Sequence, residues 1–159
     1  KSVDGIHTYN ENENVVLLGT FSKAHGLANL RVGYSVAHPQ ITENIRVVAT
    51  PFAVSSVAED AAVASLANID QVLERVEGLV AERERVAAAL AEMGWKIPST
   101  QANFVWLPLG EKTDQFVERA NAVALSVRGF SNEGVRVSIG EVEANDRFIE
   151  LCKESLDLA

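Results

Sequence analysis

The sequence has 159 residues, of which 47% are hydrophobic and 23% charged, with a formal net charge of −8 at pH 7. A chain of this length and composition buries one sizeable core, which excludes an intrinsically disordered protein. The acidic balance argues against nucleic acid or an anionic membrane as a partner, because phosphate groups recruit basic surfaces. Cys152 is the only cysteine, so an internal disulfide is excluded and a reducing, cytoplasmic compartment is expected.

The first part of the chain is expected to be the end of an α/β domain. Residues 1–14 are polar and indicate a surface loop. The short apolar runs at 15–18 and 32–37 are typical of strands buried on both faces, as in a parallel sheet flanked by helices. A helix is expected over 40–50, ending at a proline, and another over 55–67 that is apolar nearly all round and therefore buried.

A long amphipathic helix is expected next, because apolar residues recur at spacings of three and four over 70–93. Gly94 is well placed to cap it, and at 1.5 Å per residue the helix is roughly 36 Å long. Shorter strands and helices then alternate over residues 103–107, 113–124, 135–139 and 143–156. This alternation is typical of a small α+β domain.

The segment after the first predicted strand carries reactive side chains, in the position where open α/β sheets bind ligands. Ser22 offers a hydroxyl, Lys23 an amine, and Arg31 a guanidinium that can grip a phosphate. A neutral lysine can form an imine with an aldehyde, and pyridoxal phosphate carries both an aldehyde and a phosphate. The residues alone leave open the more common alternative, in which Lys23 and Arg31 are solvated surface side chains.

Residues 20–34, with the sequence TFSKAHGLANLRVGY, closely resemble the cofactor-lysine motif of the fold-type I aminotransferases, the class I and II group. The resemblance implies that Lys23 forms the Schiff base with pyridoxal 5'-phosphate and then shuttles the proton of the substrate's α carbon. It also implies that Ser22 and Arg31 bind the phosphate, with Thr20 in the same cofactor site.

A second motif, GVRVSIG at residues 134–140, resembles the family's small-domain strand whose arginine pairs with the substrate carboxylate. The resemblance gives this role to Arg136, and a guanidinium fork fits a planar carboxylate. Arg128 is a competing candidate, and an isolated arginine on a short strand is more often a solvated edge residue.

Two further segments, ATPFAV at 49–54 and QANFVWLPLG at 101–110, resemble the histidinol-phosphate aminotransferase branch and its close relative, the bacterial aromatic amino acid (phenylalanine) aminotransferase. The resemblance favours an aromatic amino acid over histidinol phosphate as the amino donor. Asn103 is a candidate substrate-site residue, although an asparagine at a strand start can equally bond the nearby backbone.

Two positions depart from the family pattern. His25 stands where tyrosine or phenylalanine is common, and it is expected to be a ring that packs beside the site. Asn29 stands where glycine is common, and because asparagine tolerates the left-handed conformation, the backbone turn there is expected to survive. His7 and His38 have no partners that indicate a metal site, so no metal is expected.

The family's other cofactor contacts lie upstream of the lysine motif: an aspartate at the pyridinium, a tyrosine at the cofactor hydroxyl, a stacking aromatic ring and an asparagine. None of those motifs is in this sequence, which starts at Lys1 without a methionine. We therefore expect an incomplete active site, inactive by itself, with the missing N-terminal half of the same protein, roughly as much chain again, before Lys1.

The fold implied by the resemblance is α/β in three parts. Residues 1–69 are the C-terminal part of a large pyridoxal-phosphate-binding domain with a mostly parallel sheet and helices. Residues 70–94 are the connecting helix, and residues 95–159 are a small α+β C-terminal domain.

The activity implied by the resemblance is transfer of an amino group from an aromatic amino acid, or alternatively from histidinol phosphate, to a 2-oxo acid by a homodimer. Two rivals remain. One is a non-catalytic remnant that serves as an interaction module. The other is a phosphate- or nucleotide-binding module with Ser22, Lys23 and Arg31 as anion ligands, although the glycine spacing matches neither a Walker nor a dinucleotide motif.

Overall fold

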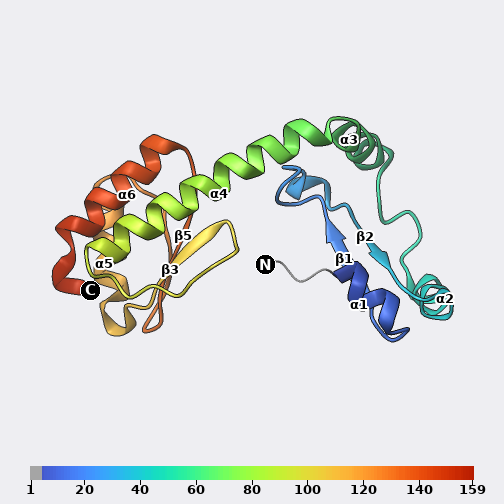
Figure 1. The fold of residues 1–159 in the computed structure, drawn as a ribbon, viewed down its shortest axis with the longest axis horizontal. Coiled ribbons are helices and arrows are strands. Elements are labelled where there is room, and N and C mark those ends of the chain that lie inside the picture. Colours follow the sequence, from blue (N-terminus) through green and yellow to red (C-terminus); the bar gives the residue numbers. More distant parts are fainter. Residues whose placement is uncertain (1–4) are drawn as a thin grey trace. The chain divides into compact units, whose positions relative to one another are not determined.

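A computed structural model describes residues 5–159 (Figure 1). Residues 1–4, which begin the predicted N-terminal loop, lie outside the described residues. The chain divides into two compact units, Lys1–Arg75 and Val76–Ala159. The boundary falls inside α4, a long helix over Ile69–Glu92, which is the helix that the apolar spacing predicts.

The first unit combines short helices with one pair of strands. Its described elements are α1 Gly5–Glu11, β1 Leu17–Thr20, a 3-10 turn Ala28–Leu30, β2 Gly33–Val36, α2 Pro39–Val48 and α3 Ser56–Ala67. The prediction of a loop is wrong over Gly5–Glu11. There His7 Nδ1 and Glu11 Oε2, one helical turn apart, lie 3.3 Å from each other, a spacing that supports a helix of otherwise polar composition.

The strands β1 and β2 pair antiparallel, with Leu17 opposite Val36. This corrects the expectation of parallel strands buried on both faces. Leu18 is 84% exposed, and Thr20, Gly33 and Ser35 on the same face are exposed as well, so the described residues leave that face of the pair open. A short continuous apolar run predicts a strand but reveals neither the direction of its partner nor how many faces are covered.

Helix α3 begins where the sequence predicts. Ser55 is its N-cap, and the Ser55 hydroxyl accepts a hydrogen bond of 3.2 Å from the backbone amide of Ala58. The expectation that this helix is buried all round is wrong, because only its alanine face, Ala58 and Ala62, is buried. Val57 and Val63 are 65% and 67% exposed. The described residues therefore bury one narrow strip of α3 and leave its β-branched side chains open.

Helix α4 ends in a glycine cap, as the sequence predicts. Gly94 has φ of +94°, and its amide donates to the Ala91 carbonyl at 3.0 Å. The next amide, that of Trp95, donates to the Leu90 carbonyl at 3.0 Å. These two bonds form a Schellman motif, and the buried side chains of Trp95 and Leu90 make its apolar contact. The motif turns the chain into the core of the second unit.

The second unit contains a three-stranded antiparallel sheet in the order β3-β5-β4. Its elements after α4 are β3 Phe104–Leu107, a 3-10 turn Gly110–Lys112, α5 Thr113–Ala122, β4 Arg128–Phe130, β5 Gly134–Ser138, α6 Val142–Glu154 and a 3-10 turn Leu156–Leu158. Four of these match predicted strands and helices to within about two residues, whereas β4 was not predicted. The small α+β C-terminal region is confirmed.

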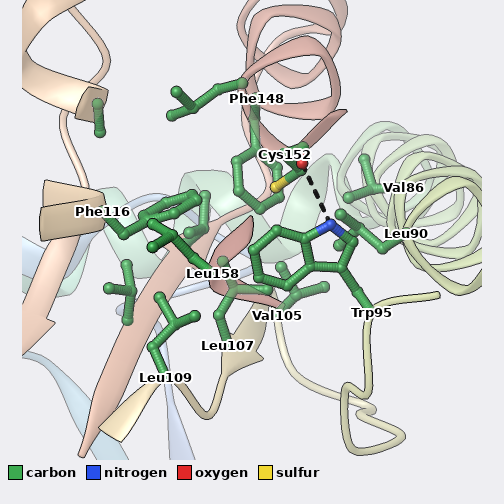
Figure 2. Packing of buried hydrophobic residues seen from close by; sticks show 14 of the residues in the cluster. Val86, Leu90, Trp95, Val105, Leu107, Leu109, Phe116, Phe148, Cys152 and Leu158 are labelled. Carbon is green, nitrogen blue, oxygen red and sulfur yellow. Dashed lines mark hydrogen bonds between the residues drawn. The ribbon is translucent and has the colours of Figure 1, made fainter. Parts of the chain in front are cut away.

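One face of this sheet packs into a continuous apolar core (Figure 2). The fully buried members come from α4, both long strands, α5 and α6: Val86, Leu90, Val105, Leu107, Val135, Phe116, Ala120 and Cys152. Trp95 Nε1 donates to the Cys152 carbonyl at 3.3 Å, which satisfies the indole inside the core. Burial raises the pKa of the Cys152 thiol, so this cysteine is a packing residue.

The end of the second unit is tied to α5 by an ion pair. Arg119 on α5 donates to both carboxylate oxygens of Asp157, at 2.8 Å and 2.7 Å. These hydrogen bonds from Arg119 lower the pKa of Asp157 and raise that of the guanidinium. The bidentate geometry fixes the last turn of the chain against α5.

Candidate functional site

The turn that carries Lys23 lies between β1 and β2 and is closed around Phe21. The Phe21 amide donates to the Val32 carbonyl at 3.3 Å, and the Phe21 carbonyl accepts from the Leu27 amide at 2.9 Å. The ring itself is 6% exposed. Phe21 is therefore the one buried residue of the loop, and Lys23 and Ala24 after it are exposed.

Lys23 stands at the tip of this turn. The Gly26 amide donates to the Lys23 carbonyl at 3.0 Å, and Gly26 has φ of +71°, a conformation that favours glycine. The Lys23 side chain is exposed. Within residues 5–159 its amine has no hydrogen bond and no carboxylate partner. The turn thus presents a primary amine that has no partner among the described residues.

Thr20 ends β1, and Ser22 and Arg31 lie in the loop that carries Lys23 to β2. Thr20 Oγ1 accepts from the Ser22 amide at 3.0 Å, which orders the chain at the end of β1. Arg31 donates from Nη1 to the Ala28 carbonyl at 2.7 Å, and the rest of its guanidinium has no partner among the described residues. A hydroxyl, a guanidinium and an amine in one loop are the donor groups that suit a phosphate.

The left-handed turn predicted at Asn29 is found two residues later. Asn29 lies in the 3-10 turn Ala28–Leu30, and Arg31 has φ of +53° and ψ of +39°. The prediction for Asn29 is therefore wrong. The short 3-10 helix ends at Arg31, so the change of chain direction falls on the arginine, and the hydrogen bond to Ala28 holds its side chain over that turn.

Two contacts attach the Lys23 turn to helices of the same unit. His25 Nδ1 lies 2.8 Å from Ser65 Oγ on α3, and the tautomer of the ring decides which atom donates. Arg75 on α4 donates from Nη2 to the Ala24 carbonyl at 3.5 Å. The His25 ring also lies 4.6 Å, centroid to centroid, from the Phe21 ring. The prediction that His25 packs as a ring beside the site agrees with this geometry.

Arg136 lies at the centre of the sheet of the second unit. On β5 it is opposite Trp106 of β3 on one side and Arg128 of β4 on the other. Its Cζ atom lies 5.4 Å from the centre of the Phe104 ring. This face is opposite the apolar core, because the neighbouring residues Val135 and Val137 are buried. Arg136 therefore projects from the face of the sheet that is opposite the core, and it is partly buried there.

Aromatic and guanidinium groups share this face. Arg128 Cζ lies 5.2 Å from the centre of the Phe130 ring, and the Trp106 and Phe130 rings meet edge to face at 5.6 Å. Arg128 and Arg136 form a cross-strand pair of like charge, which is unfavourable by itself. Neither guanidinium has a carboxylate partner among residues 5–159. The pair is thus suited to an external anion.

Asn103 immediately precedes β3. Its backbone carbonyl accepts from the Ile139 amide at 2.9 Å, which extends the pairing of β3 with β5. Its side chain is exposed and bonds no group of the described chain. The structure thus leaves the Asn103 amide available, and its substrate role stays a prediction.

Several contacts of the site were not predicted from the sequence. Phe104 and Trp106 alternate with the buried Val105 and Leu107, and this period of two could have placed both aromatic rings beside Arg136. Ser65 lies 40 positions from His25, and no local pattern joins them.

Within the part of the chain that the structure describes, no group of three or more His, Cys, Asp and Glu side chains could hold a metal ion. None of the described helices combines the length and apolar composition needed to cross a bilayer.

The sequence matches, over residues 1–151, the family described as aminotransferase class I and II. It is 53% identical over 148 residues to the aromatic amino acid aminotransferase of Streptomyces avermitilis, an alignment that covers 93% of this chain and 41% of that protein. For the aromatic amino acid aminotransferase of Streptomyces coelicolor the identity is 50% over 151 residues, covering 95% of this chain and 42% of that protein.

The structure is similar to that of the histidinol-phosphate aminotransferase from Sinorhizobium meliloti in complex with pyridoxal-5'-phosphate, with a TM-score of 0.75 and 25% identity over 91% of this chain and 42% of that chain. This chain therefore spans about two fifths of the length of the curated relatives it matches, 41% and 42% for the two Streptomyces proteins.

Proposed function

This chain belongs to the class I and II aminotransferases, and from that premise we propose that its protein transfers an amino group from an aromatic amino acid to a 2-oxo acid with pyridoxal 5'-phosphate as cofactor. The observation that carries the proposal is the free Lys23 amine at the tip of the turn after β1, inside the segment that matches the family. The aromatic donor is supported by the names of relatives that are about half identical to this chain.

The side chains of the first unit fit this cofactor. Its aldehyde needs a primary amine without a carboxylate partner, and Lys23 supplies one. Its phosphate needs hydrogen-bond donors, which Ser22 and Arg31 supply, while Thr20 orders the amide of Ser22. When bound, the cofactor supplies the electron sink that a transamination requires.

In the proposed reaction Lys23 acts on a proton. Its amine would take the proton from the substrate's α carbon and return one to the product. Ser22 and Arg31 hold the phosphate so that the amine and the reacting carbon keep one geometry, which is the condition for an efficient proton transfer.

Arg136 is proposed to bind the substrate carboxylate. Its guanidinium is fixed over the Phe104 ring and faces a like charge on Arg128, so an anion relieves the repulsion between the two arginines. A bidentate contact would orient the substrate as well as bind it. Asn103 is proposed to contribute an amide at the edge of the same site.

The architecture and assembly of the complete protein belong to the same proposal. Residues 1–69 would form the large cofactor-binding domain together with further chain. Residues 70–94 would be the helix that connects this domain to the small domain, which residues 95–159 would form. The family favours a homodimer with amino acid and 2-oxo acid substrates. A cytoplasmic location is supported by the single, unlinked cysteine, which is buried.

Steady-state kinetics of the full-length protein test this function. With phenylalanine, tyrosine or tryptophan as the donor and 2-oxoglutarate as the acceptor, we expect kcat/KM at least about tenfold above that for histidinol phosphate, the difference that pocket contacts of about 1.4 kcal/mol produce. A preference for histidinol phosphate would overturn the substrate assignment. A melting temperature raised by a nucleotide and not by pyridoxal phosphate would favour an anion-binding module.

A further inference from the structure

Two polar contacts attach the Lys23 turn to the helices α3 and α4. The Ala24 carbonyl accepts from Arg75, and the His25 ring bonds the Ser65 hydroxyl. Both contacts follow Lys23 directly in sequence. They therefore act on the backbone from which the reactive amine projects.

The contact of His25 is the stronger of the two. Its distance of 2.8 Å is that of a good hydrogen bond, whereas the 3.5 Å between Arg75 Nη2 and the Ala24 carbonyl is at the limit. The His25 ring is partly buried and leans on Phe21 at 4.6 Å, with 47° between the ring planes. Phe21 in turn meets the Tyr34 ring edge to face at 6.1 Å. His25 is thus held by a hydrogen bond on one side and by a ring on the other.

The two partners bring together separate parts of the unit. Ser65 lies near the end of α3, on a position that is only partly exposed, and His25 lies in the loop between the two strands. A phenylalanine at position 25 would keep the ring contact and lose the nitrogen that meets Ser65. The hydrogen bond to Ser65 can therefore be removed without removing the packing of the ring on Phe21.

We propose that His25 and Ser65 are a positioning pair that fixes the Lys23 turn against α3 and thereby strengthens the binding of pyridoxal phosphate; the proposal rests on the function proposed above. The lysine amine sits on a flexible four-carbon stem. It can meet the cofactor while Ser22 and Arg31 hold the phosphate only if the backbone at position 23 stays in place. Immobilising that backbone before binding removes an ordering cost that the ligand would otherwise bear.

A double-mutant cycle on the full-length protein tests the pair. The variants are His25→Phe, Ser65→Ala and the double variant, with Ser56→Ala, an exposed serine of the same helix, as the matched control. The dissociation constant and the absorption spectrum of bound pyridoxal phosphate are measured, together with the melting temperature of the cofactor-free protein. We expect each single variant to weaken cofactor binding by about threefold to tenfold, the range of one hydrogen bond.

If His25 and Ser65 act as a pair, each single substitution already removes their hydrogen bond. The double variant should then bind pyridoxal phosphate no more weakly than the single variant with the lower affinity. The control should bind as the wild type does. Losses that multiply in the double variant, or a lowered melting temperature with unchanged cofactor affinity and spectrum, would overturn the pair. If the wild-type protein itself bound no pyridoxal phosphate, the proposed function would fall first, and this inference with it.

Discussion

The two units of this chain differ in where their apolar side chains lie. In Val76–Ala159 the large apolar residues converge on one core, with Phe116 and Phe148 almost fully buried. In Lys1–Arg75 the described buried residues are scattered, and all but three of the exposed large hydrophobic side chains belong to this unit. Phe52, for example, is 101% exposed. The second unit stabilises itself by burial, whereas the first holds its reactive turn mainly by local hydrogen bonds.

The proposed cofactor-binding residues and the main apolar core therefore lie in different units. The proposed cofactor residues lie in the unit whose described apolar side chains are the more exposed. In the second unit, the large apolar side chains are instead buried in one core.

The largest expected effect is on chemistry in the first unit. Replacing Lys23 by arginine keeps the positive charge but removes the amine proposed to attach the cofactor, so kcat of the full-length protein should fall by about 10²-fold to 10⁴-fold. Because the side chain is exposed and unpaired, the melting temperature of the cofactor-free protein should hardly change. Full activity in the variant would contradict the assignment.

The next prediction compares the loss of stability when a phenylalanine is replaced by alanine in each of the two units. In the 159-residue chain, Phe116→Ala should lower the free energy of unfolding by about 3 to 5 kcal/mol, because it opens a cavity in the core. Phe52→Ala should change it by less than about 0.5 kcal/mol. Urea unfolding measures both. Equal losses would show that the contrast between the units is wrong. A large loss for Phe52→Ala that occurs only in the full-length protein would show that Phe52 is buried there.

A smaller effect is expected on substrate binding in the second unit. Arg136→Lys keeps a positive charge but loses the bidentate fork, so KM for the amino acid should rise by about tenfold, the range for one hydrogen bond to a charged group. The affinity for pyridoxal phosphate should be unchanged. The same substitution at Arg128 is the matched control, because that arginine lies opposite on β4. A larger effect at Arg128 would transfer the carboxylate role to it.

The smallest effect concerns the ion pair at the end of the second unit. Asp157 has a pKa lowered from 3.8 by the hydrogen bonds from Arg119, so its carboxylate stabilises the fold above the unfolded pKa, and this stabilisation is lost as pH falls through the folded value. Asp157→Asn should therefore be slightly less stable than the wild type at pH 7 and equally stable well below pH 3.8. Urea unfolding at both pH values measures the difference. A difference that persists in acid would exclude the ion pair as its cause.

Sequence patterns predicted the second unit better than the first. The spacing of apolar residues located α4, and Gly94 located its end, because these signals depend only on local backbone and on burial within the same unit. The strand β4 was not predicted because its three residues, Arg128–Phe130, are too short for a period to show. In the first unit, apolar runs predicted strands and α3 correctly, but their burial was wrong because no local pattern records which neighbours are present.

The candidate site divides in the same way. Lys23, Ser22 and Arg31 could be chosen because one contiguous motif contains them, and the structure places them around one turn. The ring of His25 was predicted to pack beside the site, but its partner Ser65 was not found, because their contact joins positions far apart in the chain. Contacts between distant segments form through tertiary packing, which no local spacing encodes.

The most direct test of the central claim is borohydride reduction of the full-length protein with pyridoxal phosphate, followed by peptide mapping. The account predicts a pyridoxyl group on Lys23 and on no other lysine of this chain. Labelling at a different lysine, or no labelling while the protein is folded, would contradict it.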